Sequence, residues 1–125
     1  MKILLFAIFL FQSPTIQQSD LQTISKAIAA GDANKLGNFF DQEVALTIDK
    51  KESFFSKEAA NRKVADFFSG HRPKNFVQVH EGASKEGNAR YFIGDLSTTS
   101  GDFRVYIYMK ISDGKMLIQE LRFDL

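Results

Sequence analysis

Apolar residues follow two different periods along this chain, a helical one in the first half and an alternating one in the second. Between Asp20 and Gly70 most apolar residues recur every three or four positions, which indicates amphipathic helices. From Asn75 to Leu125 apolar and polar residues alternate in four runs that short turns separate. This order predicts an α+β domain: a cone-like, curved antiparallel sheet with three helices packed on one face.

The first helical segment is expected to begin with Asp20 as its N-cap and to end in a left-handed turn at Gly31. Its apolar stripe has helical spacing and consists of Leu21, Ile24 and Ile28. A second, short helix is expected to start at Asp32 and to carry the apolar residues Leu36, Phe39 and Phe40. The sequence therefore predicts two short helices joined by a kink.

A strand and a third helix complete the first half. Residues 44–48 are rich in β-branched side chains and alternate, so they predict a strand, and residues 53–55 are expected to pair with it after a turn. Ser56 is a candidate N-cap for the third helix, which Gly70 ends and Pro73 keeps from resuming. The apolar stripe of this helix is Ala60, Val64, Phe67 and Phe68.

Four strands are expected in the second half. Their predicted ranges are residues 76–81, 90–98, 103–111 and 116–123, the first of them stopped by Gly82. Asp113 and Gly114 form a strong hairpin signal between the last two, because both residues tolerate positive φ. These four strands and the strand from the N-terminal half make up the predicted sheet.

Side chains of the third predicted strand separate most clearly into two faces. One face carries Phe103, Val105, Ile107, Met109 and Ile111, and the other carries Arg104, Tyr106, Tyr108 and Lys110. The remaining strands are less one-sided, and β-bulges can shift the phase of a strand. The sequence therefore does not assign which face meets the helices.

Tyr91, Tyr106 and Tyr108 are the candidate residues of a dimer face. A sheet with one solvated face would alternate more regularly than these strands do, and monomers seldom expose large apolar patches. We therefore expect the outer face of the sheet to pair with a second copy of the chain. In the alternative, the stems of Arg104 and Lys110 cover the rings and the face stays in water.

The N-terminus has the build of a secretory signal peptide. Lys2 precedes an apolar run at residues 3–11, and polar residues follow it. This run is too short to span a bilayer, which needs about 20 apolar residues. We expect residues 1–18 to be a signal peptide and residues 19–125 to be one exported domain, periplasmic or secreted, with no integral membrane segment. A buried N-terminal segment is the alternative.

Composition narrows the classes of function. Removing Lys2 with the signal peptide leaves 15 basic residues (16 less one) against 15 acidic residues, and no basic block is present, so nucleic-acid binding has little electrostatic support. Cysteine is absent, which excludes disulfides and a thiol nucleophile. The chain has 13 phenylalanines and no tryptophan, and we expect most of these rings in the core.

No sequence motif points to a particular chemistry. His71 and His80 are the only side chains that titrate near neutrality without a shifted pKa, and their positions do not match metal-ligand spacing. No Gly-x-Ser-x-Gly elbow and no phosphate-binding loop is present. If a site lies inside the cone, its candidate residues are Asp49, His80 and Glu120, with a tyrosine as hydrogen-bond donor. We expect no cofactor and no metal.

The order of predicted elements resembles the nuclear-transport-factor-2-like fold, also called cystatin-like. The strings GDANKLGNFF, SKEAANRKVADFF, PKNFVQVHEG and YFIGDLSTTSGDFRVYIYMK resemble a family of small exported bacterial proteins, domain-of-unknown-function family 4783. This resemblance covers almost the whole mature chain, residues 20–123, but implies no activity. The wider superfamily includes isomerases, hydratases and epoxide hydrolases as well as binding domains, and fold alone does not give function.

Two hypotheses about function follow. The first is an exported, non-catalytic domain that binds a ligand or a protein, with a second copy, a small apolar ligand or another protein as its partner. The alternative is a small enzyme of isomerase or hydrolase type with an acid or histidine site inside the cone. The two differ in what the cone contains: phenylalanine side chains or a cavity with converging polar groups.

Overall fold

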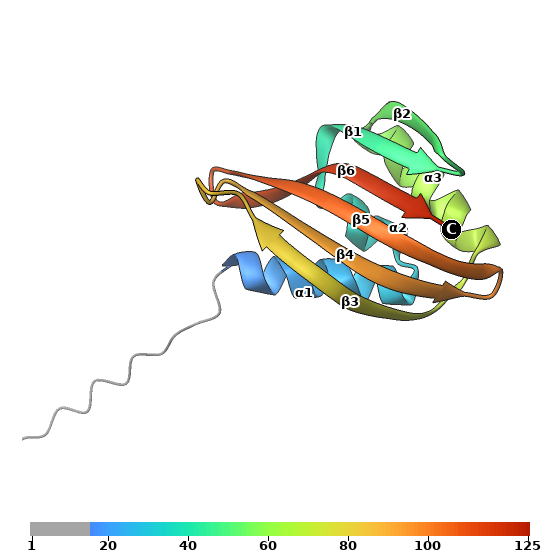
Figure 1. Cartoon of the computed structure of the whole chain (residues 1–125). Helices are drawn as coiled ribbons and strands as arrows, with labels where there is room; N and C mark the ends of the chain where they lie inside the picture. The colour runs from blue at the N-terminus through green and yellow to red at the C-terminus, as the bar shows by residue number, and fades with distance from the viewer. Residues whose placement is uncertain (1–15) are drawn as a thin grey trace, which may run out of the picture.

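The computed structural model describes residues 16–125, which fold into three helices and a six-stranded sheet (Figure 1). The helices are α1 (Ile16–Ala30), α2 (Ala33–Gly37) and α3 (Lys57–Gly70). The strands are β1 (Phe40–Ile48), β2 (Lys51–Ser56), β3 (Pro73–Ala83), β4 (Ala89–Thr98), β5 (Gly101–Ser112) and β6 (Lys115–Asp124). The predicted α+β class is confirmed.

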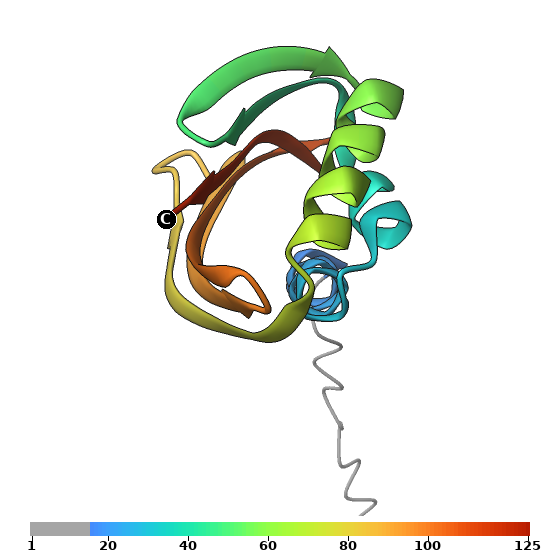
Figure 2. The same cartoon turned by 90° about the vertical axis from the view of Figure 1, so that its right-hand side faces the viewer.

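Strand order in the sheet is β2-β1-β6-β5-β4-β3. All neighbours are antiparallel except β1 and β6, which run parallel, so the sheet is mixed and not wholly antiparallel as expected. The sheet is strongly curved, and the three helices cover its concave side (Figure 2). A parallel pair requires a long connection, and here α3 and four strands lie between its two members in sequence.

Most local signals in the first half hold, but several element boundaries along the chain differ from the prediction. Asp32 caps α2 by accepting a hydrogen bond from the Lys35 N–H at 3.0 Å, and Ser56 caps α3 by accepting one from the Ala59 N–H at 3.2 Å. By contrast, Asp20 is not an N-cap, because α1 already begins at Ile16. No helix breaker separates residues 16–19 from Asp20, so the helix extends through them.

Two further differences concern Phe40 and Gly82. Phe40 belongs to β1 and not to the preceding helix, which ends at Gly37, where the backbone lies against the Asn61 side chain. Gly82 does not stop β3, which continues to Ala83. A glycine is tolerated inside this strand because the ring of Tyr91 on the neighbouring strand β4 covers it.

Phenylalanine rings fill the concave side of the sheet. Phe40, Phe92 and Phe123 are almost completely buried. The ring of Phe67 on α3 stacks on Phe123 with centroids 4.2 Å apart and meets Phe103 edge-on at 5.0 Å. Each fully buried side chain of this kind stabilises the fold by about 2–3 kcal/mol, so the interior of the cone is a packed core.

A bulge in β6 explains why its sequence alternates poorly. Tyr108 pairs with Glu120 and Met109 pairs with Ile118, so Gln119 has no opposite residue on β5. The extra residue shifts the phase of the strand by one position. As a result Met116 and Ile118 before the bulge, and Leu121 and Phe123 after it, are all buried against the helices.

Two expectations concern the N-terminal segment and the membrane. The predicted signal peptide falls almost entirely on residues outside the described part of the chain, and so stays a prediction. Among residues 16–125, no helix is both long enough and apolar enough to cross a bilayer.

Candidate functional site

Three tyrosines come together on the convex, outer face of the sheet. In the register of β4 and β5, Tyr91 lies opposite Tyr108 and Ile93 lies opposite Tyr106. The exposed fractions of Tyr91, Tyr106 and Tyr108 are 40%, 37% and 40%, and Ile93 is half-buried. We call these four residues the tyrosine patch. They line a shallow hollow of about 200 Å³ together with Glu120.

Neighbouring side chains hold the rings of the patch in place. Tyr91 lies over Gly82 of β3, so close that a Cβ at Gly82 would lie 2.2 Å from the ring. The Tyr91 hydroxyl is also 3.4 Å from Nε2 of His80. On the other side, the Arg122 guanidinium lies 6.0 Å from the centroid of the Tyr106 ring, within range of a cation–π contact. Glycine at position 82 is what leaves room for the first of these arrangements.

Charges of both signs surround the patch. The Nε–H of Arg104 donates to Asp95 across β4 and β5 at 3.0 Å, and this hydrogen bond raises the pKa of Arg104. The Nε–H of Arg122 donates to Asp124 at 2.7 Å. Glu120 forms no ion pair with any residue in the described range. The outer face thus presents aromatic rings at its centre with guanidinium and carboxylate groups around them.

The residues proposed for a site inside the cone do not meet there. His80 pairs with Ile93 in the sheet register and lies exposed on the outer face, beside Tyr91. Glu120 lines the hollow of the tyrosine patch, also on the outer face. Asp49 occupies the turn between β1 and β2 with φ of 54° and borders a cavity of about 180 Å³ at one end of the sheet.

The tyrosines proposed as a dimer face, in contrast, share one surface, as the register and exposures above show. The sequence indicated a common face for Tyr106 and Tyr108 because β5 alternates without a bulge between them. It could not place His80 and Glu120, since each lies beside a bulge that changes the face of its neighbours.

A polar cluster that the sequence did not indicate lies on β3, on the concave side of the sheet. A groove of about 290 Å³ runs between α1 and this strand. The Gln78 amide there donates to Glu81 at 2.8 Å, and a guanidinium nitrogen of Arg90 lies 3.7 Å from the same carboxylate. The register shift between Gln78 and His80 turns Gln78 and Glu81 to the same side. Glu81 therefore has Gln78 and Arg90 as partners, as in a structural ion pair.

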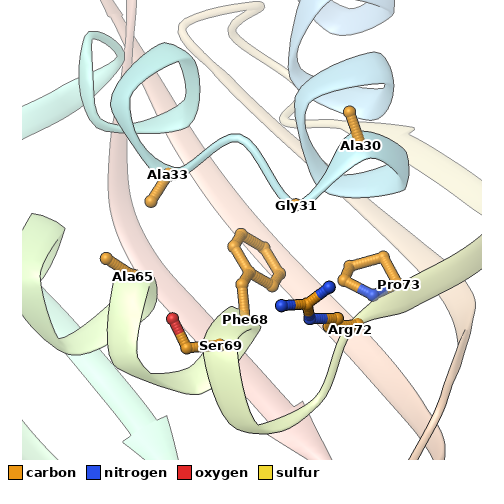
Figure 3. A pocket seen from close by; sticks show the side chains of 8 residues that line it. All are labelled: Ala30, Gly31, Ala33, Ala65, Phe68, Ser69, Arg72 and Pro73. Carbon is orange, nitrogen blue, oxygen red and sulfur yellow. The ribbon is translucent and has the colours of Figure 1, made fainter.

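The cavity at the junction of the helices measures about 450 Å³ (Figure 3). Small side chains at the end of α1, the start of α2 and on α3 leave this space, and its lining residues are Ala30, Gly31, Ala33, Ala65, Phe68, Ser69, Arg72 and Pro73. Figure 3 shows the Arg72 guanidinium between the Phe68 ring and Pro73. Its polar side chains, Ser69 and Arg72, do not include an acid–base pair.

Metal ligands do not converge anywhere in residues 16–125: no group of three or more histidine, aspartate or glutamate side chains is placed to hold an ion. Of the surfaces described, the tyrosine patch is the one that groups three partly exposed aromatic side chains.

Comparison with protein families identifies the family of this chain. The model of the family described as "Domain of unknown function (DUF4783)" matches residues 21–124. This chain belongs to the DUF4783 family. The match begins at Leu21, close to the expected start of the mature domain, and it confirms the resemblance seen in the sequence. No curated protein matches this DUF4783 chain.

Solved structures of similar proteins agree with the fold. A DUF4783 family protein from Bacteroides uniformis is 28% identical and superposes with a TM-score of 0.78, over 82% of this chain and 94% of that one. One from Bacteroides ovatus is 25% identical with a TM-score of 0.78, over 82% and 91%. An NTF-2 like protein of unknown function from Silicibacter pomeroyi, 13% identical with a TM-score of 0.60 over 86% and 90%, shares the fold. The DUF4783 domain is thus nuclear-transport-factor-2-like in architecture.

Proposed function

We propose that this DUF4783 domain is an exported, non-catalytic interaction domain that forms a homodimer through the tyrosine patch. The observation that carries the proposal is the grouping of Tyr91, Tyr106 and Tyr108 around the half-buried Ile93 on one face of the sheet. Tyrosine is enriched at protein interfaces, where its ring is buried and its hydroxyl finds a partner at the rim.

Charge favours a second copy as the occupant of this surface. A face that pairs with itself must not carry one sign of charge alone, because identical charges would then oppose each other. The patch meets this condition, since Glu120 and Arg122 border it on β6 and the Asp95–Arg104 pair borders it on β4 and β5. Both signs are available to form pairs around buried rings.

Packing of the concave side supports a non-catalytic role. Enzymes that use an open sheet of this kind need a cavity with converging polar groups. Here Phe40, Phe92 and Phe123 occupy the concave side, and His80 and Glu120 lie on the other face. The proposal therefore assigns function to the outer surface and a purely structural role to the interior.

Export is supported by the sequence alone: one lysine, an apolar run at residues 3–11 and polar residues after it. Mass spectrometry of the protein purified from its native host tests this part. We expect the chain to begin near residue 19, and a chain that still begins at Met1 would contradict export by signal cleavage.

Sedimentation equilibrium tests the homodimer. We expect the purified protein to have twice the mass of one chain at tens of micromolar. Tyr106→Glu places a carboxylate at the centre of the patch and is expected to give a monomer with an unchanged circular dichroism spectrum. Lys85→Glu, in the turn between β3 and β4, introduces a carboxylate outside the patch and should remain dimeric. A monomeric wild type would overturn the proposal.

A further inference from the structure

A second accessible surface lies at the opposite edge of the sheet, between β2 and α3. It is a groove of about 270 Å³ lined by Leu46, Ile48, Lys51, Ser53, Phe55 and Lys63. Leu46 is buried, while Ile48 and Phe55 are half-buried and still reached by solvent. The groove therefore offers an apolar lining that the core does not cover.

Two lysines border this apolar groove, Lys51 from β2 and Lys63 from α3. Nζ of Lys63 lies 5.8 Å from the centroid of the Phe55 ring. Neither lysine forms an ion pair with a residue of the described chain. A pair of cations over an apolar groove favours a ligand that carries negative charge next to an apolar group.

The backbone of β2 adds a third property, since this strand lies at the end of the sheet and pairs only with β1. Asp49 and Lys50 have φ of 54° and 63°, as in a two-residue hairpin turn, and Ile48 and Lys51 flank it. The flanking pair of such a hairpin exchanges hydrogen bonds, and alternate residues then turn their backbone groups outward. Glu52 and Phe54 therefore present free N–H and C=O groups along the edge.

We propose that β2 and the adjoining groove bind an extended peptide segment of a protein partner, which adds as a further strand. Its backbone pairs with Glu52 and Phe54, and alternate side chains point toward α3. An apolar side chain of the segment enters the groove beside Phe55. Acidic side chains two positions before and after it meet Lys51 and Lys63.

A peptide suits this surface better than a small amphiphile such as a fatty acid. Both ligands would place a negative charge near the lysines and an apolar group against the lining of the groove. Only a peptide also uses the free backbone groups of Glu52 and Phe54, which run along the groove. This proposal concerns a different surface from the tyrosine patch, so a result that contradicts the homodimer does not contradict the peptide site, and the reverse also holds.

The probe is a fluorescein-labelled peptide, Thr-Glu-Thr-Leu-Thr-Glu-Thr, whose glutamates and leucine share one face when the peptide is extended. Fluorescence anisotropy with the purified protein is expected to show saturable binding that weakens with salt. The same peptide with lysine in place of both glutamates is expected to bind at least tenfold more weakly. Methylation of one alternate set of peptide nitrogens should abolish binding, and methylation of the other set should not.

Variants and amide exchange locate the site. Lys51→Glu and Lys63→Glu are each expected to weaken binding by about three- to fivefold, the range of partly exposed ion pairs. Lys85→Glu and Tyr106→Glu are expected to leave it unchanged. On binding, the amides of Glu52 and Phe54 should gain protection from hydrogen exchange, whereas those of Ser53 and Phe55 already face β1.

Three results would overturn the peptide site. The first is equal binding of the acidic and basic peptides. The second is no binding of either, as expected if the lysines serve to keep other strands off this edge. The third is competition by octanoate without protection of the Glu52 and Phe54 amides, which would assign the groove to a small amphiphile.

Discussion

Two glycines of the sheet are covered by aromatic rings, one on each face, and they differ in how the ring is held. At Gly94, on the concave side, an added Cβ would lie 2.3 Å from the Phe76 ring and 3.0 Å from the Val77 carbonyl oxygen. The Phe76 ring is itself packed against Phe92, with centroids 6.3 Å apart. At Gly82, the obstructing Tyr91 ring lies on the open outer face and can turn aside.

Gly94→Ala is therefore expected to lower the free energy of unfolding by about 1–3 kcal/mol, the range for overpacking a core. Gly82→Ala is expected to lower it by less than about 1 kcal/mol, because only an exposed ring must move. Urea denaturation in the Tyr106→Glu background measures both without a contribution from association. Equal losses in the free energy of unfolding for the two substitutions would contradict tight packing around Gly94 on the concave side.

Asp20 gives a second test at this scale, because partial burial raises the pKa of its carboxyl group. A raised pKa in the folded state means that folding favours the protonated form, so stability falls as pH rises through the range in which Asp20 ionises. Asp20→Asn removes this effect. The variant is expected to be more stable than the wild type at pH 7, by less than about 0.5 kcal/mol because the group is partly in water.

Below the ordinary pKa of aspartate, about 3.9, the wild type and Asp20→Asn are expected to converge in stability. Asp102→Asn, at an exposed position in β5, is the control and should show no such convergence. Thermal melts of the three proteins between about pH 3 and about pH 7 make the comparison. A stability gain from Asp20→Asn that is the same at every pH would contradict the raised pKa.

Single residues also show why the candidate site was hard to predict. Which face a strand residue occupies depends on counting alternate positions from a known one. Tyr106 and Tyr108 share one uninterrupted strand, so their common face was predictable. His80 and Glu120 each follow a bulge, and a bulge has no signature in this sequence that would mark it in advance.

At the scale of elements, the bulge in β6 decides which side chains reach the core. Deletion of Gln119 would restore strict alternation and turn either Met116 and Ile118 or Leu121 and Phe123 away from the helices. We expect this deletion to lower stability by more than about 4 kcal/mol or to prevent folding, because two buried side chains are lost from the core.

Gln119→Ala keeps the bulge and is the matched control. It removes only the hydrogen bond from the Gln119 amide to Asp41, 3.1 Å long, and is expected to lower stability by about 1 kcal/mol. Circular dichroism and urea denaturation compare the two variants. Equal stability of the deletion and of Gln119→Ala would contradict the role assigned to the bulge.

Elements whose signals are local were predicted from the sequence. Asp32 and Ser56 cap helices, Gly31 has φ of 67°, and the Asp113–Gly114 turn has positive φ at both positions. Each of these depends on residues within one turn. The parallel pairing of β1 with β6 was not predictable, because it joins residues 75 positions apart, such as Ala45 and Glu120, and no local motif marks such a pairing.

At the scale of the whole molecule, the central claim is that the interior of the DUF4783 domain is structural and the outer face of its sheet is the functional surface. The sequence predicted both a cone and a dimer face, but it could not tell whether the cone was filled. That outcome depends on how the ten phenylalanines of residues 16–125 pack in three dimensions. Rings such as Phe67, Phe103 and Phe123 fill it from opposite sides.

Isotope-filtered nuclear magnetic resonance on a mixture of labelled and unlabelled protein tests this claim most directly, because it detects only contacts between copies. We predict contacts from the rings of Tyr91, Tyr106 and Tyr108 to the outer face of a second copy, and their loss in Tyr106→Glu. Contacts between copies that involve only the helices, or no contacts at all, would contradict the claim.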